Sequence, residues 1–191
     1  LLTGLPNRTA FDERLAAAFA QAQQTHELLA VMHLDLDGFK AVNDGLGHHI
    51  GNRVLREVAE RLRTLVAPGD SLARLAGDEF ALLLPNLASQ QAGITLAEDI
   101  LEAINRPFQI EGKPLHVTAS IGIACNCPVT KQAHELLQRA DLAMAQAKRQ
   151  GRNTWHWYRG NAQTTTEDSV LLRHDLHTAL REDQFELHYQ P

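Results

Sequence analysis

The most constraining feature of the sequence is a pair of adjacent acidic residues between two apolar runs. The stretch RLAGDEF occupies residues 74–80, and ALLL follows at residues 81–84. A Gly-Asp pair between two strand-like segments predicts a tight β-hairpin over residues 71–84. The carboxylates of Asp78 and Glu79 repel each other at its tip, and a divalent cation such as Mg²⁺ would offset that repulsion. A solvated acidic turn is the alternative interpretation of this hairpin taken alone.

A second pair of carboxylates lies upstream, in the stretch LDLDGFKAVND at residues 34–44. Residues 28–36 predict a strand that is apolar on both faces and therefore central in a covered sheet. Asp35 and Asp37 fall at its end, where a rigid sheet can hold catalytic carboxylates. Alternatively, the two acids cap the short helix that follows, a role that we expect of Asp37 in either case.

The rest of the chain alternates between helical and strand-like patterns. Asn7 or Thr9 is suited to cap the first helix, and Gly151 is suited to end the last one. The spacing of apolar residues predicts helices over 7–24, 38–45, 48–66, 89–105 and 131–150, and strands near 107–111, 115–124 and 153–158, with a turn at 112–114.

Composition excludes several classes of protein. With 191 residues, of which 44 % are hydrophobic, the chain can form a domain with a core. Its net charge of −5 argues against a nucleic-acid binder that neutralises phosphates. No apolar run reaches membrane-spanning length and no signal peptide is visible, so we expect a cytoplasmic location. Cys125 and Cys127 are too close for a structural disulfide and lack zinc-type partners.

The two acidic stretches together resemble the GGDEF family, the diguanylate cyclases. In that family the pattern D(I/L)DxFKx(I/V)ND precedes R(Y/L/F)GG(D/E)EF, and LTGLPNR at residues 2–8 is similar to the family's entry motif. The resemblance covers residues 1 to about 158, and we assign residues 1–159 to a GGDEF domain. It implies an α/β (α+β) fold, with a central, mainly antiparallel sheet flanked by helices, like the palm of nucleotidyl cyclases. Because the sequence opens inside this motif, we expect it to be a piece of a longer protein.

The resemblance implies a reaction in which two GTP molecules condense into cyclic di-GMP. Mg²⁺ or Mn²⁺ would be the cofactor, held by Asp35, the carbonyl of Leu36 and Asp78. Asp78 matches the catalytic acid/base, and Glu79 would hold metal or position Asp78. Each domain supplies half of the active site, so the implied partner is a second GGDEF protomer.

The resemblance also implies a set of GTP-binding residues. Asn43 matches the residue that recognises guanine, since an amide offers both a donor and an acceptor. Without the family, Asn43 is a turn residue, His48 a helix-start residue, and the two basic residues near 150 are solvated charges favoured at a helix C-terminus. The residues that match GTP-binding positions are Phe39, Lys40, Asn43, His48, Asn52, Gly77, Lys148 and Arg152.

Three positions depart from the family pattern. Ala76 replaces the first glycine of the signature, where we expect a costly positive φ and a methyl group close to the nucleotide. Asn52 replaces an aspartate that contacts guanine, which predicts weaker GTP affinity or relaxed base choice. The inhibitory RxxD motif is APGD at residues 67–70, so we expect no product inhibition through that site.

Beyond the domain, the composition turns polar over residues 160–169, which we interpret as a linker. Residues 170–191 resemble the opening of an EAL domain, the cyclic di-GMP phosphodiesterase that often follows a GGDEF domain. An ordinary C-terminal helix is the alternative. The EAL motif itself is absent, so this chain cannot hydrolyse cyclic di-GMP by that route, and the implied partner in cis is a downstream EAL domain.

Two functions from different classes fit these residues. The retained carboxylates and basic residues favour a cyclase, whereas Ala76, Asn52 and the EAL-like tail favour a GTP-binding regulatory module without turnover. A purely structural dimerisation domain fits poorly with so many retained site residues. We expect no nucleic-acid partner and no membrane segment.

Overall fold

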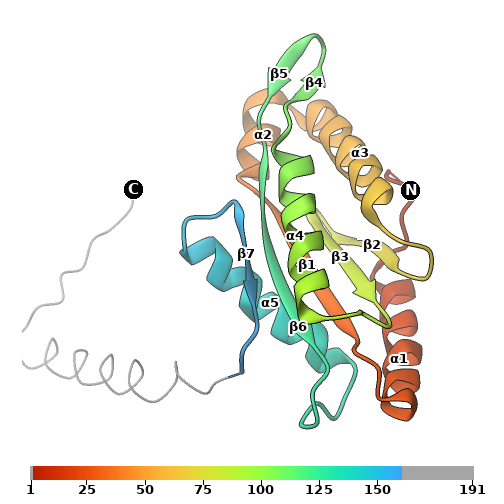
Figure 1. The fold of residues 1–191 in the computed structure, drawn as a ribbon. Helices are drawn as coiled ribbons and strands as arrows, with labels where there is room; N and C mark the ends of the chain where they lie inside the picture. The colour runs from red at the N-terminus through yellow and green to blue at the C-terminus, as the bar shows by residue number, and fades with distance from the viewer. Residues whose placement is uncertain (1, 161–191) are drawn as a thin grey trace, which may run out of the picture. The chain divides into compact units, whose positions relative to one another are not determined.

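A five-stranded sheet forms the centre of the computed structural model, which describes residues 2–160. The strands follow the order β2 (Ser71–Ala76), β3 (Glu79–Leu84), β1 (Ala30–Asp37), β6 (Thr118–Cys125) and β7 (Thr154–Trp157). Neighbouring strands are antiparallel except for β6 and β7, which are parallel. The structure therefore confirms the mainly antiparallel sheet and the central position of the strand that carries Asp35 (Figure 1).

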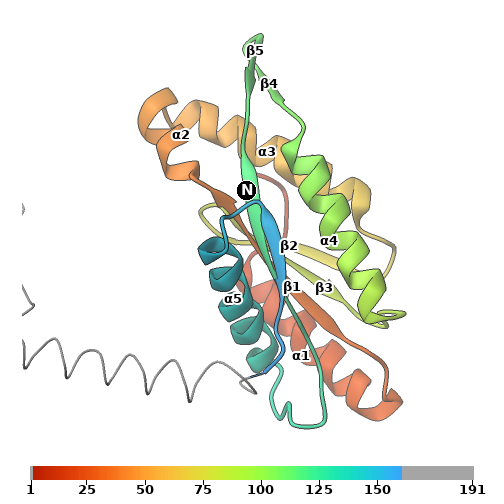
Figure 2. The same ribbon diagram turned by 60° about the vertical axis from the view of Figure 1, so that its left-hand side comes forward.

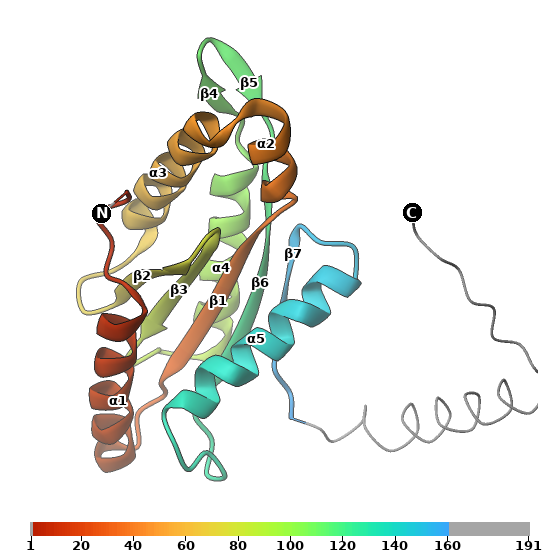
Figure 3. The same ribbon diagram turned by 180° about the vertical axis from the view of Figure 1, so that it is seen from behind.

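Helices cover both faces of this sheet, as expected. One face carries α1 (Arg8–Thr25) and α5 (His134–Arg149), which lie in front of the sheet in Figure 3. The opposite face carries α3 (His48–Leu65) and α4 (Gln90–Asn105), while the short α2 (Phe39–Leu46) follows β1 (Figure 2).

Successive side chains of β1 pack into two separate hydrophobic cores, one on each face of the sheet. Val31 packs with α1 and α5, whereas Met32, Leu34 and Leu36 pack with α3 and α4. Successive side chains of a strand point to opposite faces, so a strand that is buried on both sides must be apolar throughout. Polar residues of β1 begin at His33 and fall only on the face that α5 covers, where His33 lies near Asp141 and Asp35 near Lys148.

Side chains and glycines define the helix ends. The Asn7 side chain accepts a hydrogen bond from the amide of Ala10 at 3.0 Å, so of the two predicted caps of α1, Asn7 and Thr9, the structure selects Asn7. After α5, Gly151 adopts a φ of +112°, and the next amide, of Arg152, donates to the carbonyl of Ala147 at 3.2 Å. This left-handed turn ends the helix and reverses the chain into β7.

One predicted strand is divided in the structure. Residues 115–124 were expected to form a single strand, but β5 (Lys113–Leu115) pairs with β4 (Phe108–Ile110) in a separate ribbon, and β6 begins only at Thr118. The turn prediction at 112–114 is also wrong, because the turn residues are Glu111 and Gly112, with φ values of +53° and +75°. Two consecutive positive φ values are typical of a two-residue hairpin turn.

Arg61 ties α3 to the C-terminal end of α4. Its guanidinium donates to the carbonyls of Ala103 at 2.7 Å, Arg106 at 2.5 Å and Pro107 at 3.0 Å. The same group lies 3.8 Å from the ring centroid of Phe108. The last carbonyls of a helix have no partner within the helix, so one cation satisfies several of them at once.

Most of the predicted linker at 160–169 and all of the EAL-like segment at 170–191 lie outside the described residues. Within the part of the chain that is described, no helix is both long enough and apolar enough to cross a membrane.

We expect Arg61→Ala to lower the free energy of unfolding by about 2–4 kcal/mol, because several helix-end carbonyls and an aromatic ring lose their partner. Urea unfolding of purified protein measures this change. The control is Arg56→Ala on the exposed side of the same helix, for which we expect a change within about 0.5 kcal/mol. Equal losses in the two variants would contradict this account.

Candidate functional site

The predicted acidic hairpin is present between β2 and β3. Its tip is the pair Gly77-Asp78, and the partners on either side are Ala76 and Glu79. Nε and Nη2 of Arg74 both donate to the carbonyl of Gly77, at 2.9 Å and 2.5 Å. These two hydrogen bonds stabilise the turn, and the carboxylate of Asp78 remains at its tip.

Ala76 does not strain this turn. In the hairpin Gly77 has a positive φ, at +40°. Ala76 does not have a positive φ. The expectation of a costly φ at position 76 was therefore wrong, because the residue still belongs to the extended strand β2. Its side chain is exposed, so the added methyl group changes the surface of the hairpin and not its backbone.

Asp35 lies where several predicted site residues meet. Its carboxylate is 2.8 Å from Nζ of Lys148, and the strand register places it opposite Glu79. Burial raises the pKa of Asp35, the pair with Lys148 lowers it, and the charges of Asp78 and Asp37 raise it further. The structure thus gathers the two predicted metal-binding acids and a predicted phosphate-binding lysine around one point.

Lys148 and Arg152 differ in their surroundings. The Lys148 side chain is 34 % exposed and bound to a carboxylate, so its interpretation as a solvated helix-end charge is wrong. Arg152 is exposed and follows the end of α5, in a turn where Gly151, Arg152 and Asn153 all have positive φ. The turn places both basic residues at the same end of α5, close to the carboxyl end of β1.

Asp37 holds this turn in place instead of capping α2. Its carboxylate accepts hydrogen bonds from Oγ1 of Thr118 at 2.8 Å, Oγ of Ser120 at 2.7 Å and the amide of Asn153 at 3.1 Å. The N-cap position of α2 is Gly38, without a side-chain cap, so the expected capping role of Asp37 was wrong. Its partners lie far along the chain, and no local sequence signal could have identified them.

The remaining predicted GTP-binding residues lie around the corner between α2 and α3, where Gly47 ends one helix and begins the next. Phe39 has a buried side chain, which leaves its backbone as the part available to a ligand. Asn43 is half-buried in the middle of α2. The exposed members of this group are Lys40, His48 and Asn52.

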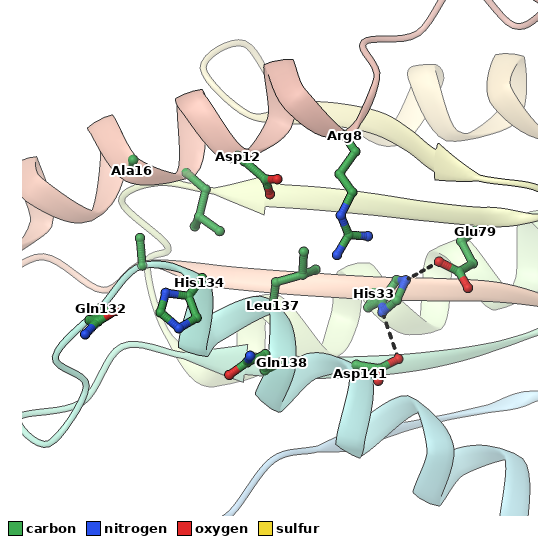
Figure 4. A pocket seen from close by; sticks show the side chains of 12 residues that line it. Arg8, Asp12, Ala16, His33, Glu79, Gln132, His134, Leu137, Gln138 and Asp141 are labelled. Atoms are coloured by element: carbon green, nitrogen blue, oxygen red, sulfur yellow. Dashed lines mark ion pairs between the residues drawn. The ribbon is translucent and has the colours of Figure 1, made fainter.

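His33 is a site neighbour that the sequence reasoning missed. It is 4 % exposed, and its Nε2 and Nδ1 lie 3.4 Å from Glu79 and 3.3 Å from Asp141 (Figure 4). Neither ring nitrogen has a hydrogen-bond partner among the described residues. Burial lowers the pKa of His33, the two carboxylates oppose that shift, and Arg8 adds to it. The only sequence signal was a histidine within the apolar run AVMHL.

The His33 ring lies at the floor of an open cavity of about 730 Å³ between α1 and α5. Figure 4 shows the Arg8 side chain reaching from α1 toward the histidine, with Asp141 on the opposite wall. The lining includes the cationic Arg8 together with the acids Asp12, Glu79 and Asp141, so the cavity does not carry charge of one sign only.

The donor atoms at the acidic end of β1 suit a hard divalent cation. Asp35 and Asp78 offer carboxylate oxygens, and Leu36, whose side chain is buried, can offer only its backbone. Leu36 also lies beyond the last β1–β3 register pair, Asp35 with Glu79. Within residues 2–160 no group of three or more His, Cys, Asp or Glu side chains is arranged to hold a metal alone. Mg²⁺ fits such an incomplete oxygen set, because it retains waters and takes phosphate oxygens.

A palm-like sheet with an acidic hairpin facing the end of its central strand defines a nucleotide-cyclase type of domain. The family model described as "Diguanylate cyclase, GGDEF domain" matches residues 1–154. The chain therefore belongs to the GGDEF family, as its two acidic motifs indicated.

Two relatives from Pseudomonas aeruginosa match along the whole chain. MucR, a bifunctional diguanylate cyclase/cyclic di-GMP phosphodiesterase, is 45 % identical over 190 residues, and the match covers 28 % of its length. NbdA, a cyclic di-GMP phosphodiesterase, is 39 % identical over 190 residues, and 24 % of its length is covered. The chain thus spans about a quarter of these curated relatives, and its match to MucR includes the segment after the GGDEF domain, in agreement with a following EAL domain.

The GGDEF domain of TpbB from Pseudomonas aeruginosa is a similar solved structure. It superposes with a TM-score of 0.82 at 38 % identity, and the match covers 90 % of this chain and 97 % of that one. This likeness confirms the fold class inferred from the sequence.

We expect Asp37→Ala to destabilise the domain by about 2–3 kcal/mol, because two hydroxyls and an amide lose a charged acceptor. Chemical unfolding measures the loss, and Asp44→Ala, an exposed acid in α2, is the control for removal of one carboxylate. Unchanged stability in Asp37→Ala would show that the carboxylate does not anchor the turn at Asn153.

The lowered pKa of His33 predicts a pH dependence of stability. Between its ordinary pKa of 6.5 and the lower folded pKa, the unfolded chain binds a proton that the folded domain does not. The contribution of His33 to stability is therefore complete above pH 6.5 and is lost as the pH falls below it. Urea unfolding at pH 7.5 and 5.5 should show a smaller loss for His33→Leu than for the parent, with His116→Leu, an exposed histidine, as the control. An equal pH dependence in parent and His33→Leu would contradict the lowered pKa.

Proposed function

We propose that this domain binds GTP with Mg²⁺, for which Mn²⁺ can substitute, and condenses two GTP molecules into cyclic di-GMP. Each 3′-hydroxyl attacks the α-phosphate of the other GTP, and two pyrophosphates leave. The observation that carries the proposal is the convergence of Asp35, Asp78 and Lys148 at the end of β1, beside the strand that bears Glu79. Acids and a lysine in this arrangement suit phosphoryl transfer, in which charge neutralisation and positioning supply most of the catalysis.

Each of these residues has a role in the proposal. Asp35, the carbonyl of Leu36 and Asp78 hold the cation, which supplies charge neutralisation at the phosphates and favours deprotonation of the attacking 3′-hydroxyl. Asp78 acts as the acid/base, and its position at a turn braced by Arg74 keeps its carboxylate at the tip of the hairpin. Glu79, on the strand next to Asp35, positions this acidic pair.

The corner between α2 and α3 binds the base in this proposal. Asn43 and Asn52 present amides from the two helices, and His48 lies at the start of α3 between them in sequence. Lys40 and Lys148 contact phosphates, as does Arg152 on the turn that Asp37 anchors. The backbones of Phe39 and Gly77 complete the surface around the triphosphate.

A second copy of the domain is part of the proposal, because one protomer supplies groups for only one of the two GTP molecules. The other proposed partner is an EAL domain downstream in the same chain. Asp70 is the remnant of the family's inhibitory motif, and its carboxylate accepts from the amide of Ala67 within its own loop at 3.2 Å. With no arginine at position 67, we propose that product does not inhibit through that site.

A regulatory module without turnover is the second candidate. Asn52 is exposed on α3 as an amide where the family has a carboxylate, and NbdA, which matches the whole chain, is named a phosphodiesterase only. In this case the domain binds GTP and adjusts a downstream EAL domain.

Turnover of GTP by a fused dimer of the domain separates the two candidates. We expect chromatography to show cyclic di-GMP from the parent with Mg²⁺ and a loss of about a hundredfold or more in Asp78→Ala. The control is Asp99→Ala, an exposed acid on α4. GTP binding without product would favour the regulatory module, and absence of both would overturn each candidate.

Restoring the family residue at position 52 gives a further prediction. Asn52→Asp should lower the Kd for GTP about threefold to tenfold, because a carboxylate accepts from two guanine N–H groups. Ala76→Gly is the comparison, and it should leave the folding stability nearly unchanged, since Ala76 has no positive φ to relieve. Isothermal titration measures the affinity, and an unchanged Kd in Asn52→Asp would remove the base-binding role of this position.

A further inference from the structure

Gly51 is a helical glycine whose backbone conformation does not require a glycine. It lies in the first turns of α3, is buried, and does not have a positive φ. Glycine inside a helix costs about 1 kcal/mol relative to alanine. The reason for a glycine at this position must therefore be the space that a side chain would fill.

That space belongs to residues of α2, which packs against the start of α3 (Figure 2). A Cβ atom on Gly51 would lie 2.0 Å from Oδ1 of Asn43 and 3.1 Å from its Cγ. It would also lie 3.1 Å from Cζ of Phe39. By contrast, a Cβ atom on Gly45, which is exposed in α2, would meet nothing within 4 Å. The carboxamide of Asn43 therefore rests directly on the backbone of Gly51.

The two neighbours of Gly51 differ in their freedom to move. Phe39 is 5 % exposed and fixed in the core, whereas Asn43 is half-buried and ends in a carboxamide. Added bulk at position 51 would thus be relieved mainly by displacement of the Asn43 amide. Among residues 2–160 this amide has no hydrogen-bond partner, so its donors and its acceptor are free for a ligand.

We propose that Gly51 is a specificity-determining position: it allows the Asn43 carboxamide to lie where it can contact the purine base. This inference rests on the proposed function, in which Asn43 and Asn52 recognise guanine. Gly51 also precedes Asn52 directly, so the close contact between the helices lies next in sequence to the second residue proposed to recognise the base. Because Gly51 has no side chain, the Asn43 carboxamide can occupy the space between Phe39 and α3.

Binding of unreactive nucleotides tests the inference on the full chain. The probes are α,β-methylene GTP and its adenine counterpart with Mg²⁺, measured by isothermal titration. Gly51→Ala should raise the Kd for the guanine nucleotide about tenfold and reduce the preference for guanine over adenine, as loss of one base contact would. Gly45→Ala is the matched control, and we expect its affinities to equal those of the parent.

A double-mutant cycle shows whether the effect passes through Asn43. In an Asn43→Ala background, Gly51→Ala should change the Kd less than about twofold, because the displaced group is already gone. Additive losses in the double variant would overturn the inference while leaving the proposed function intact. A parent that binds neither nucleotide would overturn the proposed function itself.

The position of the Asn43 side-chain amide can also be measured in the absence of nucleotide. The side-chain NH₂ resonance of Asn43 in ¹⁵N spectra should shift in Gly51→Ala and remain in place in Gly45→Ala. An unshifted resonance would overturn the inference. If Gly51→Ala fails to fold and Asn43→Ala does not restore folding to the double variant, contact with Phe39 dominates and the inference is equally overturned.

Discussion

The close packing of α5 on β6 is the constraint on which the site depends. A Cβ atom on Gly122 would lie 1.9 Å from the carbonyl oxygen of Ala140 and 2.2 Å from the amide nitrogen of Met144, so the helix backbone rests on the strand itself. At this depth α5 brings Asp141 against His33 and Lys148 against Asp35. A side chain at position 122 would lift the helix and separate all of these pairs.

The site is assembled from segments that are far apart in the sequence and share few local signals. The hairpin supplies Asp78, β1 supplies Asp35, and the turn after α5 supplies Arg152. Asp37 joins the last two, because its carboxylate binds the amide of Asn153 while its own strand carries Asp35. A half-buried acid thus works as a structural anchor two residues from an acid proposed to bind metal.

Much of this architecture could be predicted from local patterns. Apolar spacing located the helices and the central strand, the Gly-Asp pair located the hairpin, and Asn7 was one of two candidate caps. The errors at the turn after β4 and at Ala76 concern the φ angles of single residues, which the pattern of apolar residues does not determine. The division of the predicted strand between β5 and β6 was likewise not visible in that pattern. The roles of Asp37, His33 and Gly51 depend on partners brought in by the fold, and therefore only the structure could identify them. The roles assigned to the site residues themselves stay predictions from the family motifs.

The ion pair between Lys148 and Asp35 has a thermodynamic consequence. Each partner is proposed to bind a different part of the substrate complex, Asp35 the cation and Lys148 the triphosphate. A triphosphate that draws Lys148 away frees the carboxylate for the cation, and a cation on Asp35 frees the lysine for the phosphates. The two affinities are then coupled, and by linkage each ligand must raise the affinity of the other by the same factor. Because of this ion pair, the domain would bind the nucleotide and the cation tightly when both are present and weakly when either is present alone.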